Sequence, residues 1–286
     1  MDKITVKAYA KINLSLDVLG KMPDGYHELR SIMQLVELHD DVEITRTKGK
    51  SKIKASSSKV FLPKDEKNIA GKAVRLFLDE TGITGYDVSV FINKRNPVCA
   101  GLGGGSADGA AVLKGMNELF GTGLTLTQLE AMGEKLGADV PFCIRGGTVL
   151  CEGKGEIMTD AAPLPKCHIV ICKPDASIST PELFHLIDSR KIRLRPDNDG
   201  MLSALKADSL NGVAKRVFNV FEELVAESCG DIKVIKDELY DYGALGASMS
   251  GTGSAVFGLF DDKSKAENAY YGLKKSYREC FLTENV

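Results

Sequence analysis

Apolar and polar residues alternate along the first part of the chain. Apolar side chains occupy every second position of residues 4–18, with polar Lys11 and Asn13 between them. A period of two is typical of β-strands, so we expect one long bent strand or two consecutive strands. Asp24-Gly25 then marks a turn. Residues 88–92 alternate in the same way and predict a further strand.

The pattern changes to helical spacing after the glycine-rich residues 100–105. Apolar residues then recur at intervals of three and four, which predicts a helix beginning at Ser106. Thr127 and Glu130 have the spacing of a capping box for a second helix. Gly137 stands where the C-terminal cap of that helix is expected.

Residues 160–166 (DAAPLPK) are the best candidate for a linker. The elements expected after it are a strand at 169–172, a helix opened by Thr180-Pro181, helices around 211–227 and 231–242, a glycine-rich loop at 246–253, a strand at 255–260, a helix at 263–275 and a terminal strand. Strands and helices are mixed without the regular alternation of a doubly wound sheet. This order predicts an α+β protein with two domains, residues 1–160 and 161–286.

Composition narrows the class of protein. A length of 286 residues suits about two domains, and 43% hydrophobic with 27% charged residues is ordinary for a soluble globular protein. The net charge of −2 argues against binding nucleic acid through overall charge. No apolar run approaches the roughly 20 residues of a membrane span, and the alternating N-terminus does not resemble a signal peptide. We therefore expect a cytoplasmic protein that binds neither nucleic acid nor membrane.

Cysteine and histidine patterns do not predict a metal site. The seven cysteines are an odd number without a CxxC pair, and the four histidines form no HExxH motif. Reduced thiols in strands or cores are the expected state.

The segment at 97–111 (PVCAGLGGGSADGAA) carries the clearest chemistry. Four glycines in five residues before a helix are costly unless the backbone must approach another group closely. Successive N–H groups and a helix start together favour phosphate oxygens. No GK[ST] follows, and Ser106 replaces the third glycine of a dinucleotide fingerprint, so neither common phosphate motif applies. The alternative is an ordinary loop in which Ser106 caps the helix.

Three further features are weaker on their own. The second glycine-rich loop, residues 246–253, is also consistent with a flexible turn, although two such loops in opposite halves suggest a phosphate-rich ligand between domains. Lys11 and Asn13 lie on the same face of the predicted strand. The alternative is that this face is simply exposed to solvent. Asp139 follows a predicted helix among apolar neighbours, and its alternative role is to cap the next helix.

Together these segments resemble the signature motifs of the GHMP kinases. The three are KAYAKINLSL at 7–16, PVCAGLGGGSADGAA at 97–111 and GASMSGTGSAVF at 246–257. Within this superfamily the chain is most similar to the branch that phosphorylates 4-diphosphocytidyl-2-C-methyl-D-erythritol, through residues 10–44 and GADVPFCIRGG at 137–147. The resemblance covers the whole chain.

The resemblance implies a fold and a reaction. The fold is a ribosomal protein S5 domain 2-like N-terminal domain followed by a ferredoxin-like C-terminal domain. The reaction transfers the γ-phosphoryl group of ATP to the 2-hydroxyl of the cytidylyl substrate, with Mg²⁺, in the non-mevalonate isoprenoid pathway. A homoserine or mevalonate kinase and a non-catalytic nucleotide-binding relative are the alternatives. Tyr26-His27 argues against the first, and retention of both Lys11 and Asp139 argues against the second.

The resemblance also implies site residues. Lys11 and Asp139 are the expected catalytic pair, with Asp139 accepting the hydroxyl proton or orienting the hydroxyl. Ser106 is the expected Mg²⁺ ligand. The expected ATP contacts are Pro97, Val98, Cys99, Ala100, Gly101, Leu102, Gly103, Gly104, Gly105, Ser106 and Ala107, with Asn68 and Lys94 on the adenosine side.

Four residues are expected to bind the cytidylyl substrate. Tyr26 and Phe184 sandwich the cytosine, His27 reads its edge, and Asn13 holds the methylerythritol end. The alternatives are a Tyr-His pair at a hairpin tip and a core phenylalanine on an amphipathic helix. The expected partners are ATP and this substrate, and the expected assembly is a monomer or a homodimer.

Overall fold

The computed structural model describes residues 2–190, 192–225 and 229–286, and mixes strands with helices as the α+β prediction requires. The chain divides into two compact units, each made of several segments. One comprises Met1–Ala10, His39–Asn96 and Gly103–Gly146, and the other Lys11–Leu38, Pro97–Leu102 and Gly147–Val286. A division into domains at residue 160 stays a prediction.

Two long strands run through both units. β1 (Asp2–Lys21) is one continuous strand, and a turn joins it to β2 (His27–Lys48). Both faces of β1 are buried over residues 10–18, although the alternating pattern suggested one polar face. The polar side chains of this stretch are therefore held inside the protein.

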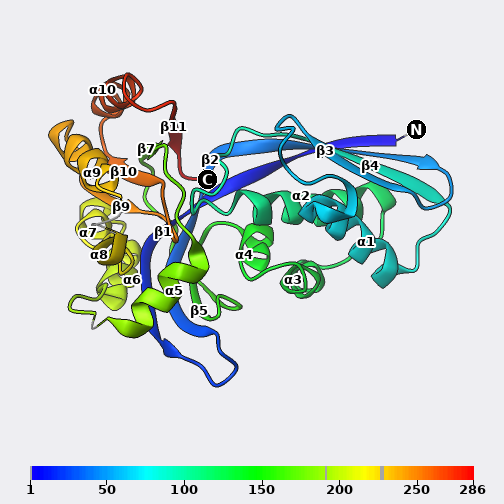
Figure 1. Cartoon of the computed structure of the whole chain (residues 1–286), viewed down its shortest axis with the longest axis horizontal. Coiled ribbons are helices and arrows are strands. Elements are labelled where there is room, and N and C mark those ends of the chain that lie inside the picture. The colour runs from blue at the N-terminus through cyan, green and yellow to red at the C-terminus, as the bar shows by residue number, and fades with distance from the viewer. Residues whose placement is uncertain (1, 191, 226–228) are drawn as a thin grey trace. The chain divides into compact units, whose positions relative to one another are not determined.

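The first unit packs helices on a sheet. β4 (Tyr86–Asn93) pairs antiparallel with β2 and parallel with β3 (Ile53–Ser57). Figure 1 shows the helices of this unit along one face of these strands. They are α1 (Ile69–Thr81), α2 (Gly104–Phe120), α3 (Leu126–Glu134) and α4 (Val140–Arg145), with the 3-10 turn Asp65–Lys67 before α1.

Three predicted helix ends in this unit are wrong by two residues. α2 has Gly103 as its N-cap, so it begins two residues before Ser106. α3 has a capping box made by Thr125 and Gln128, the same motif as predicted but two residues earlier. Its C-cap is Lys135, although the amide of Gly137 still donates to the carbonyl of Gly133 at 3.2 Å.

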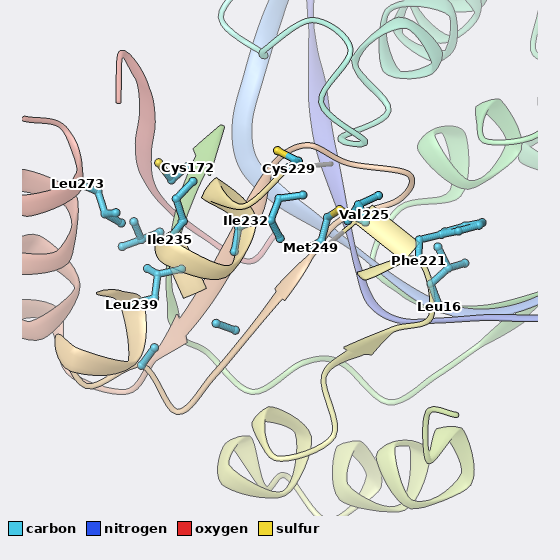
Figure 2. Close-up of a cluster of buried hydrophobic side chains, with 14 of the residues drawn as sticks. Leu16, Cys172, Phe221, Val225, Cys229, Ile232, Ile235, Leu239, Met249 and Leu273 are labelled. Atoms are coloured by element: carbon cyan, nitrogen blue, oxygen red, sulfur yellow. The ribbon is translucent and has the colours of Figure 1, made fainter. Parts of the chain in front are cut away.

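The second unit contains a four-stranded antiparallel sheet in the order β11-β7-β10-β9. Its strands are β7 (His168–Lys173), β9 (Gly246–Met249), β10 (Val256–Phe260) and β11 (Glu279–Glu284). Apolar side chains from this sheet, from α9 (Asp231–Asp241) and from α10 (Lys263–Leu273) form one core, in which Figure 2 shows Ile232, Ile235 and Leu239 of α9. Residues 246–249, predicted as loop, are thus a strand, and only the residues after them form the loop.

The second unit also contains strands beside β2 and further helices. β5 (Thr148–Gly153) pairs with β2, and β6 (Ile157–Asp160) pairs with β5. α5 (Thr180–Ser189) has Ser179 as its N-cap, one residue before the predicted Thr180. α6 (Asn198–Lys206) has no counterpart among the predicted helices, and neither has α1.

The helix predicted at 211–227 is wrong. Within the described residues this segment forms α7 (Leu210–Ala214), the two-residue strand β8 (Phe218–Asn219) and α8 (Glu222–Val225), while residues 226 and 227 lie outside them. β8 pairs in parallel with β1, where Ser15 is aligned with Phe218. A non-local strand pairing thus overrides the local helical spacing.

The state of the cysteines agrees with the sequence expectation. All seven cysteines are free thiols, and six of them are buried. In the described part of the chain, no three His, Cys, Asp or Glu side chains are grouped so that they could hold a metal ion. The helices of that part are all too short or too polar to cross a bilayer.

Candidate active site

The two glycine-rich segments contact each other through a serine hydroxyl and through backbone groups. The Ser250 hydroxyl donates to the carbonyl of Gly101 at 3.0 Å, and the amide of Ala255 donates to that of Ala100 at 3.1 Å. A Cβ on Gly101, whose φ is +75°, would lie 2.0 Å from the Ser250 carbonyl oxygen. Only glycine fits this approach. The contact lies within the second unit and joins two motifs that are about 150 residues apart.

Strand β1 brings the third motif to the same loops. The amide of Lys11 donates to the carbonyl of Leu102 at 3.0 Å, and the amide of Asn13 lies 3.3 Å from the Ser250 hydroxyl oxygen. The Lys11 ammonium donates to the side-chain oxygen of Asn13 at 2.6 Å, and the Asn13 amide nitrogen donates to Ser31 Oγ at 2.8 Å. Lys11 and Asn13 are 4% and 1% exposed, so the alternative of a solvated strand face is wrong.

The start of α2 has the features of an anion site. Its N-cap is Gly103, at φ 65°, which offers no side-chain acceptor, and the first turn contains no acidic residue. Gly105 is exposed, and a Cβ there would have no atom within 4 Å. N–H groups at a helix start attract negative charge, and here no side chain of the cap competes for them. Ser106 lies in the first turn, so it is not the N-cap.

The candidate ATP loop is divided between the two units. Residues 97–102 belong to the second unit and residues 103–107 to the first. Cys99 has φ 53° and is exposed, whereas Pro97 and Ala107 are buried. We describe the two parts of the loop separately for this reason.

A buried ion cluster lies next to the start of α2 in the first unit. The Lys94 ammonium contacts Asp40 at 2.6 Å and Asp108 at 2.8 Å, and all three side chains are at most 5% exposed. The Asn96 amide nitrogen also donates to Asp40, at 2.9 Å. A Cβ on Gly104 would lie 3.5 Å from the Lys94 nitrogen, so the cluster is in contact with the first turn of α2.

The cluster holds one negative charge in excess, and this affects its ionisation. Burial raises the pKa of Asp108 to about 7, and the charge of Asp40 adds to this effect while Lys94 opposes it. Burial acts against the Lys94 ammonium, but the two carboxylates outweigh it and raise the pKa of Lys94. One oxygen of Asp108 and the side-chain oxygen of Asn96 are buried without a hydrogen-bond partner among the described residues. The network is therefore sensitive to the proton on Asp108.

Asp139 lies at the N-cap position of α4 in the first unit. Its side chain makes no capping hydrogen bond to the helix, so the alternative in which this carboxylate serves as a cap is wrong. Asp139 is half-buried. Lys11, its expected catalytic partner, belongs to the second unit.

Asn68 has a structural contact of its own. Its side-chain oxygen accepts from the amide of Ala70 at 2.9 Å and caps α1, while its amide nitrogen donates to the carbonyl of Pro63 at 2.8 Å. Lys94 and Asn68 are thus both bound within the first unit, and their contact with adenosine stays a prediction.

The residues expected around cytosine gather in the second unit. Tyr26 is 61% exposed at the β1–β2 turn, and the Lys154 ammonium lies 4.4 Å from the centroid of its ring. Lys154 also pairs with Asp24 at 2.5 Å. The Tyr26 ring is therefore accessible to solvent and makes a cation–π contact with Lys154.

His27 and Phe184 are in direct contact. Their ring centroids are 4.8 Å apart with an interplanar angle of 33°, and Phe184 packs edge-on against buried Phe221 at 5.1 Å. Phe184 thus packs against the core through Phe221 and also contacts His27, and its role beside cytosine stays a prediction. The structure brings Tyr26, His27 and Phe184 into one unit with Asn13.

Sequence reasoning missed several polar residues of these sites. Asp188 accepts from His27 at 2.6 Å, Asp40 and Asp108 enclose Lys94, and Ser250 joins the two loops. For Asp188 a signal existed, because it follows Phe184 by four residues and so shares its helix face.

Comparison with known proteins identifies the family. Residues 68–147 match the model of the GHMP kinases N-terminal domain, and residues 201–279 match that of the GHMP kinases C-terminal domain. The chain belongs to the GHMP kinases. It is therefore an ATP-dependent small-molecule kinase, as the motifs predicted. The two matched regions together cover more than half of the chain.

Relatives within the GHMP kinases are similar over their whole length. A 4-diphosphocytidyl-2-C-methyl-D-erythritol kinase from Acetivibrio thermocellus is 45% identical over 286 residues, 100% of both chains. One from Clostridium kluyveri is 43% identical over 281 residues, 98% of this chain and 99% of its own. A crystal structure of 4-(cytidine 5'-diphospho)-2C-methyl-D-erythritol kinase superposes with a TM-score of 0.83 at 28% identity, covering 99% of each chain. These matches confirm the predicted GHMP kinase fold.

A more distant structure shares the fold alone. The homoserine kinase from Cytophaga hutchinsonii matches with a TM-score of 0.78 at 20% identity, over 100% of this chain and 95% of its own.

Proposed function

We propose that this chain transfers the γ-phosphoryl group of ATP to the 2-hydroxyl of 4-diphosphocytidyl-2-C-methyl-D-erythritol, a step of the non-mevalonate isoprenoid pathway. One observation carries the proposal: relatives at 41% to 45% identity, matched over nearly the whole chain, are kinases of this substrate. The contact between the three motifs supports it, because the proposed reaction requires the phosphate loop and Lys11 near one another.

The first turn of α2 would bind the ATP phosphates. Gly105 leaves open space there, and Gly103 leaves the N–H groups at the helix start without a side-chain cap. The positive end of the helix stabilises the phosphate charge. Phosphoryl transfer depends mainly on such positioning and charge stabilisation, so this loop would contribute to kcat as well as to ATP affinity.

The residues fit a magnesium ion that is bound largely by ATP itself. Mg²⁺ commonly uses one or two protein oxygens together with phosphates and waters, and no protein-only metal cluster exists in the described residues. Ser106, in the first turn of α2, would supply a hydroxyl ligand. When bound, the ion would offset charge on the transferring phosphoryl group.

Lys11 and Asp139 would act on the substrate hydroxyl. Asp139 would accept its proton or orient it, and the Lys11 ammonium would stabilise the developing negative charge. Asn13 holds the Lys11 ammonium at 2.6 Å and would also contact the methylerythritol end of the substrate. The assignment of both roles rests on the family resemblance.

The cytosine would bind at Tyr26, His27 and Phe184. Tyr26 exposes a ring on which a base can stack, and Phe184 closes the site from α5 while it contacts His27. His27 would read the polar edge of the base. Contacts of Asn68 and Lys94 with adenosine, and a monomeric or homodimeric assembly, belong to the same proposal.

A panel of acceptors tests this function. Purified protein is incubated with ATP, Mg²⁺ and either the cytidylyl substrate, homoserine or mevalonate, and ADP release is measured. We expect turnover with the cytidylyl substrate alone. Turnover with homoserine or mevalonate instead would assign another GHMP kinase activity, and no turnover with any acceptor would favour a nucleotide-binding relative without catalysis.

A further inference from the structure

Ser31 of β2 lies between the side chain of Asn13 and the backbone of β1. The Asn13 amide nitrogen donates to Ser31 Oγ at 2.8 Å, and the Ser31 hydroxyl donates to the carbonyl of Ser15 at 2.7 Å. Asn13 and Ser31 are 1% and 0% exposed, and all three residues belong to the second unit. These bonds therefore tie the side chain beside Lys11 to the neighbouring strands β1 and β2.

The direction of each bond follows from the chemistry of the atoms. A serine hydroxyl has one hydrogen and a carbonyl oxygen can only accept, so the hydrogen of Ser31 is used on Ser15. Ser31 Oγ then accepts from Asn13, which requires the amide nitrogen of Asn13 on that side. The side-chain oxygen of Asn13 consequently faces two groups that carry hydrogens, the Lys11 nitrogen at 2.6 Å and the Ser250 hydroxyl at 3.4 Å.

The opposite orientation of the Asn13 amide would be unfavourable at both ends. Its N–H groups would face the Lys11 ammonium, which also donates. Its oxygen would either face a lone pair of Ser31 or take the Ser31 hydrogen away from the Ser15 carbonyl. A buried polar group left without a partner is costly. Ser31 thus determines which end of the Asn13 amide meets Lys11.

We propose that Ser31 is a positioning residue for phosphoryl transfer, which orients the Asn13 amide so that its oxygen holds the Lys11 ammonium in place. Ser31 acts through Asn13, because both its hydrogen and its oxygen are used within β1 and β2. The inference rests on the proposed function, since it takes Lys11 as a catalytic residue. A misplacement of about 1 Å can cost about 100-fold in rate, so the loss of this support should reduce kcat.

The first test reads hydrogen positions in the free protein and does not depend on activity. Neutron diffraction from crystals of the deuterated full-length chain shows the deuterium atoms on Ser31 Oγ and on the Asn13 amide. We expect the Ser31 deuterium to point at the Ser15 carbonyl and the Asn13 nitrogen to face Ser31. A Ser31 deuterium that points at Asn13 overturns the proposal.

The second test measures kcat and KM with the cytidylyl substrate, ATP and Mg²⁺. Ser31→Ala removes the acceptor of the Asn13 nitrogen and leaves the Ser15 carbonyl in place. We expect kcat to fall by about 10-fold to 100-fold, with the KM for ATP unchanged. If Ser31→Ala does not fold, Ser31→Cys replaces it, because a thiol accepts hydrogen bonds only weakly and should also lower kcat. A wild-type kcat in the folded variant overturns the proposal.

Ser15→Ala is the matched control. Ser15 is also 0% exposed, but its hydroxyl donates to Asn198 at 2.5 Å and accepts from the amide of Ile32 at 3.2 Å. The control therefore loses a buried hydroxyl, and some stability, next to Ser31 without losing a bond to Asn13. We expect it to keep the wild-type kcat. Equal losses of kcat in Ser15→Ala and Ser31→Ala would indicate a general effect of stability and overturn the proposal.

A double-mutant cycle shows whether Ser31 acts through Asn13. Asn13→Ala alone should lower kcat, and adding Ser31→Ala to it should lower kcat no further. The same fold-loss from Ser31→Ala with and without Asn13 overturns the proposal. A wild-type enzyme inactive on the cytidylyl substrate overturns the proposed function instead, while the neutron map still shows the direction of the Ser31 hydrogen.

Discussion

The amide of Lys11 donates a hydrogen bond to the carbonyl of Leu102, at 3.0 Å. This bond ties strand β1 to the glycine-rich loop, although 91 residues separate the two in sequence. A residue that is proposed to act on the phosphoryl acceptor thus shares its backbone with the loop that is proposed to bind the donor. A substitution in the loop is therefore expected to affect Lys11, and a substitution at Lys11 is expected to affect the loop.

Two glycines of this loop should respond differently to a side chain. Gly105→Val adds atoms where no neighbour lies within 4 Å, so the variant should fold normally and lose ATP affinity by obstructing the phosphates. Gly101→Ala places a Cβ 2.0 Å from the Ser250 carbonyl oxygen at φ +75°, so it should be destabilised. Thermal melts and ATP titrations measure both. Unchanged ATP affinity in folded Gly105→Val would contradict the assigned role of the loop.

Tyr26 should contribute to substrate affinity rather than to folding. Tyr26→Ala should raise the KM for the cytidylyl substrate much more than the KM for ATP, because stacking on a base contributes about 1–3 kcal/mol. Tyr26→Phe keeps the ring and should be mild. Because the side chain is 61% exposed, neither variant should lower the melting temperature appreciably. An equal loss for both substrates would show that the stacking assignment is wrong.

Lys11 and Asp139 should behave as one catalytic group. Each alanine variant should lose about 10²–10⁴-fold in kcat with little change in KM, which is the range for a positioned acid–base residue. The double variant should be little worse than the poorer single variant, because both act on one transfer step. Asp139→Asn keeps the size of the side chain but is not a carboxylate. A wild-type single-turnover rate in folded Asp139→Asn would remove Asp139 from the mechanism.

The ion cluster beside α2 should give a pH-dependent stability. The pKa of Asp108 is raised from 3.8 to about 7 in the folded protein, so the folded state binds more protons than the unfolded state between these values. The contribution of Asp108 to the free energy of unfolding is therefore full below about pH 4 and is lost as the pH rises to about 7. Asp108→Asn has no such proton to lose. Urea unfolding from pH 4 to pH 8 should show the variant gaining stability relative to wild type.

Removing the cation of this cluster, Lys94, should destabilise the protein. Lys94→Met leaves Asp40 and Asp108 buried without their cation, which should cost about 3–5 kcal/mol of stability at neutral pH. Combining Lys94→Met with Asp108→Asn should recover part of this loss. A double variant no more stable than Lys94→Met would show that the two carboxylates do not repel each other as described.

The sequence pattern within a segment predicted those elements that depend mainly on interactions within the same segment. The strict alternation of residues 4–18 predicted β1, and the glycines of 101–105 predicted a close backbone approach, which Gly101 makes. The start of α2 was misplaced because glycines are poor helix formers and local propensity favoured Ser106. The helix expected at 211–227 failed where Phe218 pairs with Ser15, a contact that no local pattern reveals.

The candidate site was predictable to a similar extent. Lys11 and Asn13 were placed together by their spacing in a strand, and their side chains do contact each other. Asp188 shares a helix face with Phe184 by its spacing, but it lies 161 residues from His27, so its contact with His27 depends on how α5 packs. The depth at which the ammonium of Lys94 is buried likewise depends on Asp40, 54 residues away.

The position of the new phosphate tests the central claim most directly. Purified protein, ATP and 4-diphosphocytidyl-2-C-methyl-D-erythritol are incubated, and ³¹P NMR and mass spectrometry identify the product. We expect a single phosphate monoester on the 2-hydroxyl, formed with one ADP per product molecule. Release of ADP without phosphorylation of this substrate, or a phosphate on another hydroxyl, would contradict the proposed reaction.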